Sequence, residues 1–189
     1  LATSSAASDV YKRQVSGSGQ NAIDELINQT KQSLNNESTK NEVYGAQIAF
    51  NVIPAGNLEE NDYTDEEMKI SHETKKILDE KINISATTVR VPVVYGHSIA
   101  AHVKTNKKIN LPNLHRAFET QTGLEKYSEK DFLSPNPLEH AEGKDPVSVG
   151  RIRADLWEDD RVNIWIVADN LRKGAALNSL QIMERIMEK

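Results

Sequence analysis

Two side chains seven positions apart, Arg90 and His97, have the types and setting needed for chemistry. They lie in residues 89–103, VRVPVVYGHSIAAHV, where two apolar runs flank a turn around Gly96. This pattern predicts a hairpin or a tight strand–loop–strand unit. A guanidinium held on a strand can bind a carboxylate through two parallel hydrogen bonds, and an imidazole at a turn can exchange a proton near neutral pH. An edge arginine and a surface turn histidine are the alternative interpretation, which this segment alone leaves open.

A second pair, Glu66 and Lys69, lies in a segment that is predicted to be helical from Thr64 to about Leu78. Thr64 and Glu67 have the Thr-x-x-Glu spacing of a capping box. Residues three apart share a helix face, so Glu66 could bind an ammonium group while Lys69 binds a phosphate. A solvated ion pair explains the same spacing, and the spacing does not choose between the two.

A Gly/Ser-rich turn, Ser16, Gly17, Ser18 and Gly19, precedes a predicted helix that extends to about Leu34. Backbone N–H groups at the beginning of a helix can bind a phosphate or an amide. A simple loop with an N-cap is the alternative, and the turn alone is a weak signal.

The remaining pattern predicts the elements that hold these residues. Strands are expected at 47–53, 147–156 and 162–168, helices at 113–122 and 169–189, and an irregular loop at 125–145. Helices interleaved with at least five strands predict an α+β domain with helices packed on one face of a mixed or mostly antiparallel sheet. Residues 1–14 lack periodicity and are expected to be a disordered leader or a foreign segment.

Composition excludes several classes of function. The chain has 189 residues, a formal net charge of -5 and scattered basic residues, which argues against nucleic-acid binding. The absence of cysteine excludes disulfides and a thiolate nucleophile from this chain. Neither a membrane span nor a signal peptide is predicted, so a cytoplasmic location is expected. The five histidines are widely spaced, and no metal site is expected.

From residue 15 onward the chain resembles the C-terminal, catalytic and dimerisation domain of bacterial aspartate-semialdehyde dehydrogenases. The stretches that carry the resemblance occur in family order: VSGSG, AIDEL, IAFNVIP, YTDEEMKISHETKKIL, SATTVRVPVVYGHS, VGRIRADL and WIVADNLRKGAALN. The resemblance implies a fold like that of the C-terminal domain of glyceraldehyde-3-phosphate dehydrogenase. It also implies that residues 15–189 form the catalytic and dimerisation domain, without the NADP-binding domain, and that the assembly is a homodimer or a homotetramer.

The same resemblance implies a reaction and residue roles. The family reduces 4-phospho-L-aspartate to L-aspartate 4-semialdehyde and phosphate with NADPH, for lysine, threonine and methionine biosynthesis, through a cysteine thioester. Arg90 would bind the substrate carboxylate, Glu66 its amino group and Lys69 the phosphate, while His97 would be the general acid/base. The cofactor contacts would come from Ser16, Gly17, Ser18, Gly19 and Asn170.

Three departures from the family limit what this chain can do alone. The family's cysteine and its Gly-rich dinucleotide fingerprint lie upstream of the matching region, and Arg13 stands where the family has a glutamine. The chain alone is therefore expected to be an inactive fragment of the enzyme. Two alternatives remain: a related acyl-phosphate reductase, acting on N-acetyl-glutamyl phosphate or glyceraldehyde 3-phosphate, and a non-catalytic self-association module.

Overall fold

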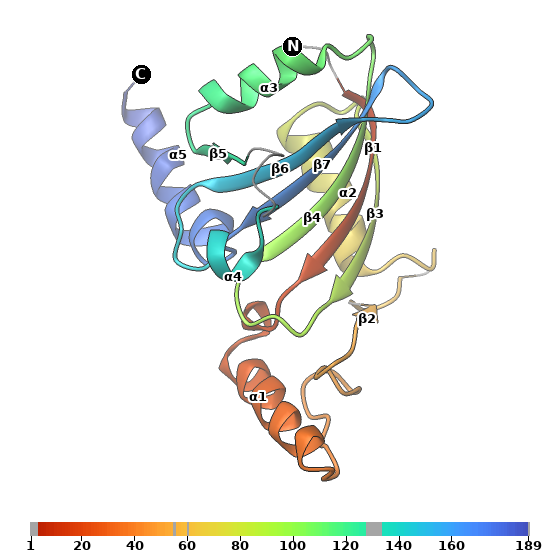
Figure 1. Ribbon diagram of the computed structural model, residues 1–189, viewed down its shortest axis with the longest axis vertical. Coiled ribbons are helices and arrows are strands. Elements are labelled where there is room, and N and C mark those ends of the chain that lie inside the picture. Colours follow the sequence, from red (N-terminus) through yellow and green to blue (C-terminus); the bar gives the residue numbers. More distant parts are fainter. Residues whose placement is uncertain (1–3, 55, 60, 128–133, 189) are drawn as a thin grey trace.

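A seven-stranded sheet forms the body of the protein (Figure 1). The computed structural model describes residues 4–54, 56–59, 61–127 and 134–188. The strand order across the sheet is β2-β3-β1-β4-β7-β6-β5. The strands are β1 (Ser4–Arg13), β2 (Ile53–Pro54), β3 (Asn83–Arg90), β4 (His97–Thr105), β5 (Leu124–Lys126), β6 (Val147–Ala154) and β7 (Arg161–Ala168).

The sheet is mixed. Strands β1 and β3 pair in parallel, as do β5 and β6, and the other neighbours pair antiparallel. The α+β prediction with a mixed, mostly antiparallel sheet is therefore confirmed.

Residues 4–13 are not disordered, because they form β1 between β3 and β4; residues 1–3 lie outside the described residues, and the alternative of a foreign segment stays a prediction. Because β1 separates these two strands, the hairpin prediction is wrong, although the strand–loop–strand interpretation holds. The physical reason is that β3 and β4 each present backbone N–H and C=O groups to a segment that lies between them. Pairing with both strands outweighs the weak strand propensity of a Ser/Ala-rich segment.

The described part of the chain also contains five α-helices: α1 (Gln20–Leu34), α2 (Asp65–Ile77), α3 (Leu111–Thr120), α4 (Pro137–His140) and α5 (Leu177–Met187). A 3-10 turn at Val15–Ser18 precedes α1, and a π-helical turn at Arg172–Ala176 precedes α5. The predicted loop at 125–145 contains β5's last residues and α4, and its residues 128–133 lie outside the described ranges. No helix in the described ranges is long and apolar enough to cross a bilayer.

The predicted strand at 47–53 is mostly irregular, because its polar side chains bond locally. Gln47 donates to the carbonyl of Ala49, and the Asn51 amide donates to the carbonyl of Gln47. Phe50 has a positive φ of 58°, which is incompatible with an extended strand. Only the two residues of β2 pair with the sheet.

The two helices α2 and α3 lie on the same face of the sheet. Thr88 pairs with Tyr11, and Tyr11 pairs with Ile99, so these side chains share one face. Ile99 in turn pairs with Ile166, which packs with α3, while Thr88 contacts Thr64 at the beginning of α2. The short helix α4 lies on the opposite face, where the Trp165 indole donates to the carbonyl of Pro135 at 2.7 Å.

Two separate apolar clusters pack helices against the rest of the fold. One lies between α3 and the strands β6 and β7, and is built on Val149, Ile152, Val162 and Ile164. The other lies beyond the end of the sheet, under α1, where the helix and its following loop extend away from the strands (Figure 1). It is built on Val15, Ala22, Ile23, Leu26, Ile48 and Ala49.

Candidate functional site

The candidate site lies at one end of the sheet, where four strand ends meet. Strand β1 ends at Arg13 and β3 at Arg90, while β4 begins at His97. Strand β7 runs antiparallel to β4 and ends at Ala168, which pairs with His97. The topology therefore brings together residues that are up to 155 positions apart in the sequence.

Arg90 is a buried cation with unused hydrogen-bonding capacity. Its side chain is only 9% exposed, its Nη1 donates to the carbonyl of Gln14 at 2.7 Å, and its guanidinium lies 5.3 Å from the centre of the Tyr44 ring. Its buried Nε has no hydrogen-bond partner. Burial lowers the pKa of Arg90, but a guanidinium keeps its proton at neutral pH. A buried arginine with a free donor is suited to binding an anion such as a carboxylate.

His97 is held in its neutral form. Its ring centre lies 4.8 Å from that of Tyr11, and its buried Nδ1 has no hydrogen-bond partner among the described residues. Burial, together with the positive charges of Arg13 and Arg90, lowers the pKa of His97 to about 4, while Asp169 acts in the opposite direction. At neutral pH the imidazole is therefore able to accept a proton.

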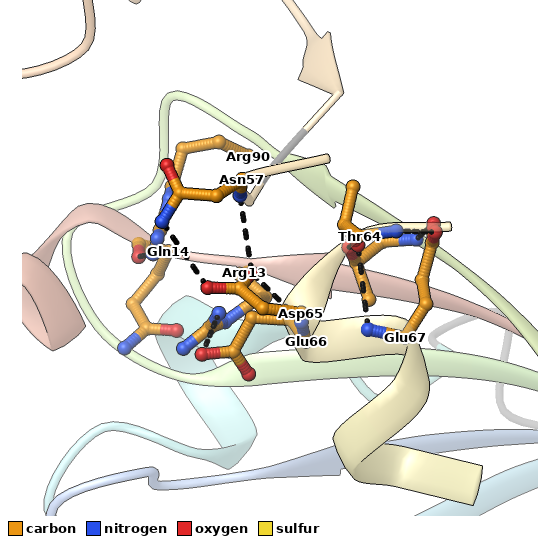
Figure 2. A network of polar contacts seen from close by, with 9 residues as sticks. Arg13, Gln14, Asn57, Thr64, Asp65, Glu66, Glu67 and Arg90 are labelled. Carbon is orange, nitrogen blue, oxygen red and sulfur yellow. Dashed lines mark hydrogen bonds and ion pairs between the residues drawn. The ribbon is translucent and has the colours of Figure 1, made fainter. Parts of the chain in front are cut away.

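Glu66 reaches this end of the sheet from α2. Its Oε1 lies 2.9 Å from Arg13 Nη1, and both side chains are mostly buried, with exposed fractions of 29% and 17%. Figure 2 shows this ion pair beside Gln14 and Arg90. The structure thus places Glu66 in the site, paired with Arg13.

Lys69 is not brought into the same cluster. It lies one turn after Glu66 on α2, is exposed, and lines a surface groove with Asp65, Met68 and His72. Among the described residues it forms no ion pair with Glu66 or any other carboxylate. Its proposed phosphate-binding role stays a prediction.

The Gly/Ser-rich turn is tied to the histidine loop through Asn170. The Asn170 amide donates to Ser16 Oγ at 3.4 Å, and its Oδ1 accepts from the N–H of Gly96, next to His97, at 3.2 Å. Ser16 Oγ also accepts from the side chain of Gln14 at 3.1 Å. Asn170 therefore connects three of the segments that the sequence singled out.

The exposed part of this turn has room for a ligand. Ser18 and Gly19 lie on the surface at the beginning of α1, and Gly19 has a positive φ of 88°. A Cβ atom at Gly19 would have no heavy atom within 4 Å, whereas one at Gly17 would lie 3.3 Å from Gln14 Nε2. A ligand can thus approach the open backbone at Gly19, whereas Gly17, which is also exposed, lies close to the side chain of Gln14.

Asp169 is a site residue that sequence reasoning missed. It is 5% exposed and accepts hydrogen bonds from the N–H groups of Leu171, Arg172 and Gly143. It fixes the end of β7, and with it Asn170, against the loop after α4. An aspartate directly before a helical segment is a helix-start signal that could have identified it.

Comparison with known proteins identifies the family. The profile of the family described as "Semialdehyde dehydrogenase, dimerisation domain" matches residues 5–173. The chain belongs to this family. The match begins at residue 5, within β1.

The relatives within the family are aspartate-semialdehyde dehydrogenases. Aspartate-semialdehyde dehydrogenase 2 of Vibrio cholerae is 44% identical over 175 residues, which are 92% of this chain and 51% of the relative. The Shewanella violacea enzyme is 44% identical over 172 residues, 90% of this chain and 51% of the relative. The crystal structure of the Vibrio cholerae enzyme II superposes with a TM-score of 0.95 at 40% identity, covering 100% of this chain and 56% of that one. The chain spans about half the length of the relatives it matches.

Proposed function

We propose that this chain supplies the substrate-binding and acid–base residues of an aspartate-semialdehyde dehydrogenase acting in the cytoplasm. The reaction is the NADPH-dependent reduction of 4-phospho-L-aspartate to L-aspartate 4-semialdehyde and phosphate. The observation that carries the proposal is the meeting of Arg90, His97 and Glu66 at one end of the sheet. The names of the relatives favour this substrate over N-acetyl-glutamyl phosphate or glyceraldehyde 3-phosphate. A relative from Vibrio cholerae was solved as a complex with ASA.

Arg90 binds the α-carboxylate of the substrate. Its guanidinium is buried and has an unpaired Nε–H, so a carboxylate would complete its hydrogen bonding. Glu66 binds the α-ammonium group from the other side, after exchanging its bond to Arg13 for one to the substrate. A cationic and an anionic group at a fixed separation orient a zwitterionic amino acid.

His97 moves the proton. In its neutral form it takes a proton from the attacking nucleophile and later returns a proton to the substrate oxygen. Phosphate is held by Lys69, whose flexible side chain lies one helical turn beyond Glu66.

The turn at the beginning of α1 fits an NADP cofactor. Gly19 offers open backbone at the N-terminus of a 15-residue helix, and the Asn170 side chain lies beside Ser16. When bound, NADPH supplies the hydride. Ser16, Gly17, Ser18, Gly19 and Asn170 would hold one side of it. The larger dinucleotide-binding domain that the resemblance implies is not among these 189 residues.

Catalysis also requires a nucleophile, and the chain contains no cysteine. Loss of a covalent nucleophile alone reduces rates by about a millionfold. The purified chain is therefore expected to show no phosphate-dependent NADPH formation from aspartate semialdehyde. Measurable formation would contradict this assignment of roles.

Ligand binding provides the positive test. L-aspartate carries both groups that the site is proposed to bind, and titration of the purified chain can be followed by NMR at the Arg90 Nε–H and His97 signals. Replacing Arg90 by Lys removes the bidentate hydrogen bonding to the ligand carboxylate and is expected to weaken L-aspartate binding about tenfold. The exposed Arg116→Lys is the matched control. Equal binding by the wild type and Arg90→Lys would refute the proposal.

Self-association is a second function, favoured by the family's description as a dimerisation domain. The sheet face opposite α2 and α3 is covered by α4 only near β6 and β7. On its uncovered part Lys12 lies 4.8 Å from the centre of the Trp165 ring, and Val10 is 41% exposed. We place the contact with a second copy on this face. Sedimentation should detect a dimer, and Val10→Lys should give a monomer; a wild type that is only monomeric would rule this out.

A further inference from the structure

Helix α2 carries two of the proposed ligand-binding residues, yet none of its residues is buried, and neither of the two apolar clusters includes any of them. Ile77 at its C-terminal end is 74% exposed. Polar contacts at the N-terminal end therefore contribute to fixing the position of Glu66.

The carboxylate of Glu67 makes most of these contacts, as Figure 2 shows in part. Its Oε2 accepts from the N–H of Thr64 at 2.9 Å, and Thr64 Oγ1 accepts from the N–H of Glu67, which completes the capping box. Its other oxygen, Oε1, accepts from the N–H of Thr88 in β3 at 2.8 Å. One carboxylate thus links the beginning of α2 to a strand.

The position of Thr88 in β3 relates this link to the candidate site. Thr88 lies two residues before Arg90, with which β3 ends, so the link joins α2 to the strand end that holds the proposed carboxylate site.

We propose that Glu67 is a positioning residue, which fixes the first turn of α2 to β3 so that Glu66 reaches the site at Arg90. Two adjacent glutamates therefore have different roles: Glu67 holds the helix, and Glu66 binds the ligand in exchange for its ion pair with Arg13. The proposal rests on the proposed function for the role of Glu66. The link itself stands on the contacts of Glu67.

The substitution Glu67→Gln tests the link with almost no change in shape. The N–H groups of Thr64 and Thr88 bond different oxygens of Glu67, and a glutamine replaces one of these oxygens by an NH2 group, which cannot accept from either. The control is Glu73→Gln, which removes the same charge from an exposed position on the same helix. Glu67→Asp is a second variant, because the shorter side chain can cap Thr64 but cannot also reach Thr88.

Two measurements are made on the full chain. The first is hydrogen exchange at the Thr88 N–H, which should accelerate at least tenfold in Glu67→Gln and stay unchanged in Glu73→Gln. The second is the ratio of the dissociation constants for succinate and L-aspartate. Succinate lacks the ammonium group and depends on Arg90 alone, so Glu67→Gln should lower the preference for L-aspartate about fivefold with little change for succinate. A general loss of stability would lower the affinities for succinate and L-aspartate equally, and this result would contradict the proposal.

The ligand-binding role of Glu66 and the positioning role of Glu67 can be refuted separately. If the wild-type chain shows no preference for L-aspartate, the proposed role of Glu66 fails. The positioning role of Glu67 is then tested by hydrogen exchange at the Thr88 N–H and by the NMR signal of the Arg13 Nε–H. This signal should shift in Glu67→Gln, because Glu66 is displaced from Arg13. If Thr88 exchange is unchanged in Glu67→Gln, or a wild-type preference for L-aspartate survives in it, the positioning role is refuted.

Discussion

Arg13 Nη1 lies 2.9 Å from Glu66 Oε1, so the carboxylate that is proposed to bind the substrate ammonium group already has a cationic partner. The pair is partly shielded from solvent and lies beside a second guanidinium, that of Arg90. An incoming ammonium group has to displace Arg13 from Glu66 before it can bind. The residue at position 13 therefore sets how strongly the site prefers an amino acid over a simple dicarboxylate.

Replacing Arg13 by the glutamine found in the family should increase the affinity for L-aspartate. A partly exposed ion pair is worth about 0.2–1 kcal/mol, so the expected gain is up to about fivefold. Affinity for succinate should fall or stay the same, because that ligand does not need Glu66. Isothermal titration calorimetry measures both, with Arg116→Gln as the control. An unchanged or weaker affinity for L-aspartate would show that Arg13 does not compete for Glu66.

Local sequence rules predicted those parts of the structure that local interactions determine. The capping box of Thr64 and Glu67 is present, and the α2 boundaries follow from it within a residue. Arg90 lies on a strand and His97 at the beginning of the next one, but the loop between them includes Val91, Val93 and Val94, which belong to the first apolar run. In the capping box Thr64 and Glu67 contact one another, so their sequence spacing is sufficient.

The errors come from interactions between distant segments. No pattern within residues 4–13 indicates that they complete a sheet, because their pairing partners are at 83–90 and 98–105. The contact of Arg13 with Glu66 depends on that placement, and the buried Asp169 contacts Gly143, which lies 26 residues earlier in the chain. Lys69 was grouped with Glu66 by its helical spacing, but the spacing does not show that only Glu66 reaches the strand ends.

His97 should titrate far below an ordinary histidine. Burial and the neighbouring arginines lower its pKa in the folded chain to about 4, while the unfolded chain has the usual value of about 6.5. Between these values the unfolded state binds more protons, so the stability that His97 contributes is lost as the pH falls from above 6.5 towards 4. From pH 8 to pH 4.5 this loss amounts to about 2 kcal/mol.

Two measurements check this expectation. NMR of the ring protons should give a midpoint near 4 for His97. Between pH 8 and pH 4.5 the unfolding free energy of His97→Asn should fall by about 2 kcal/mol less than that of the wild type. The exposed His72→Asn should leave the pH dependence of the unfolding free energy unchanged. A His97 midpoint above 6 would contradict the buried, cation-flanked environment.

Asp169→Asn should destabilise the fold and disturb the histidine loop. The carboxylate accepts three backbone N–H groups, and an asparagine directs an NH2 group at one of them. Leaving a buried N–H without an acceptor costs about 1–3 kcal/mol. Chemical denaturation measures the loss, with the exposed Glu80→Gln as a charge-matched control. Equal stability of the two variants would mean that these hydrogen bonds do not hold the end of β7.

Gly96→Ala isolates the packing of the loop that carries His97. Gly96 has a φ of +86°, and an added Cβ would lie 2.8 Å from the Cβ of Ala141. Gly123 provides the matched control, because its φ of +82° gives the same backbone strain while an added Cβ there meets no atom within 4 Å. Backbone strain alone should lower the free energy of unfolding of Gly123→Ala by about 1 kcal/mol.

The clash with Ala141 should raise the cost of Gly96→Ala to about 3 kcal/mol, since buried groups have to move apart. Moving Gly96 also lengthens the bond from its N–H to Asn170 Oδ1, so the chemical shift of the Asn170 side chain should change in this variant alone. If both alanine variants lose the same stability, backbone strain explains the whole effect. The close approach of the histidine loop to α4 would then contribute nothing to holding His97 in place.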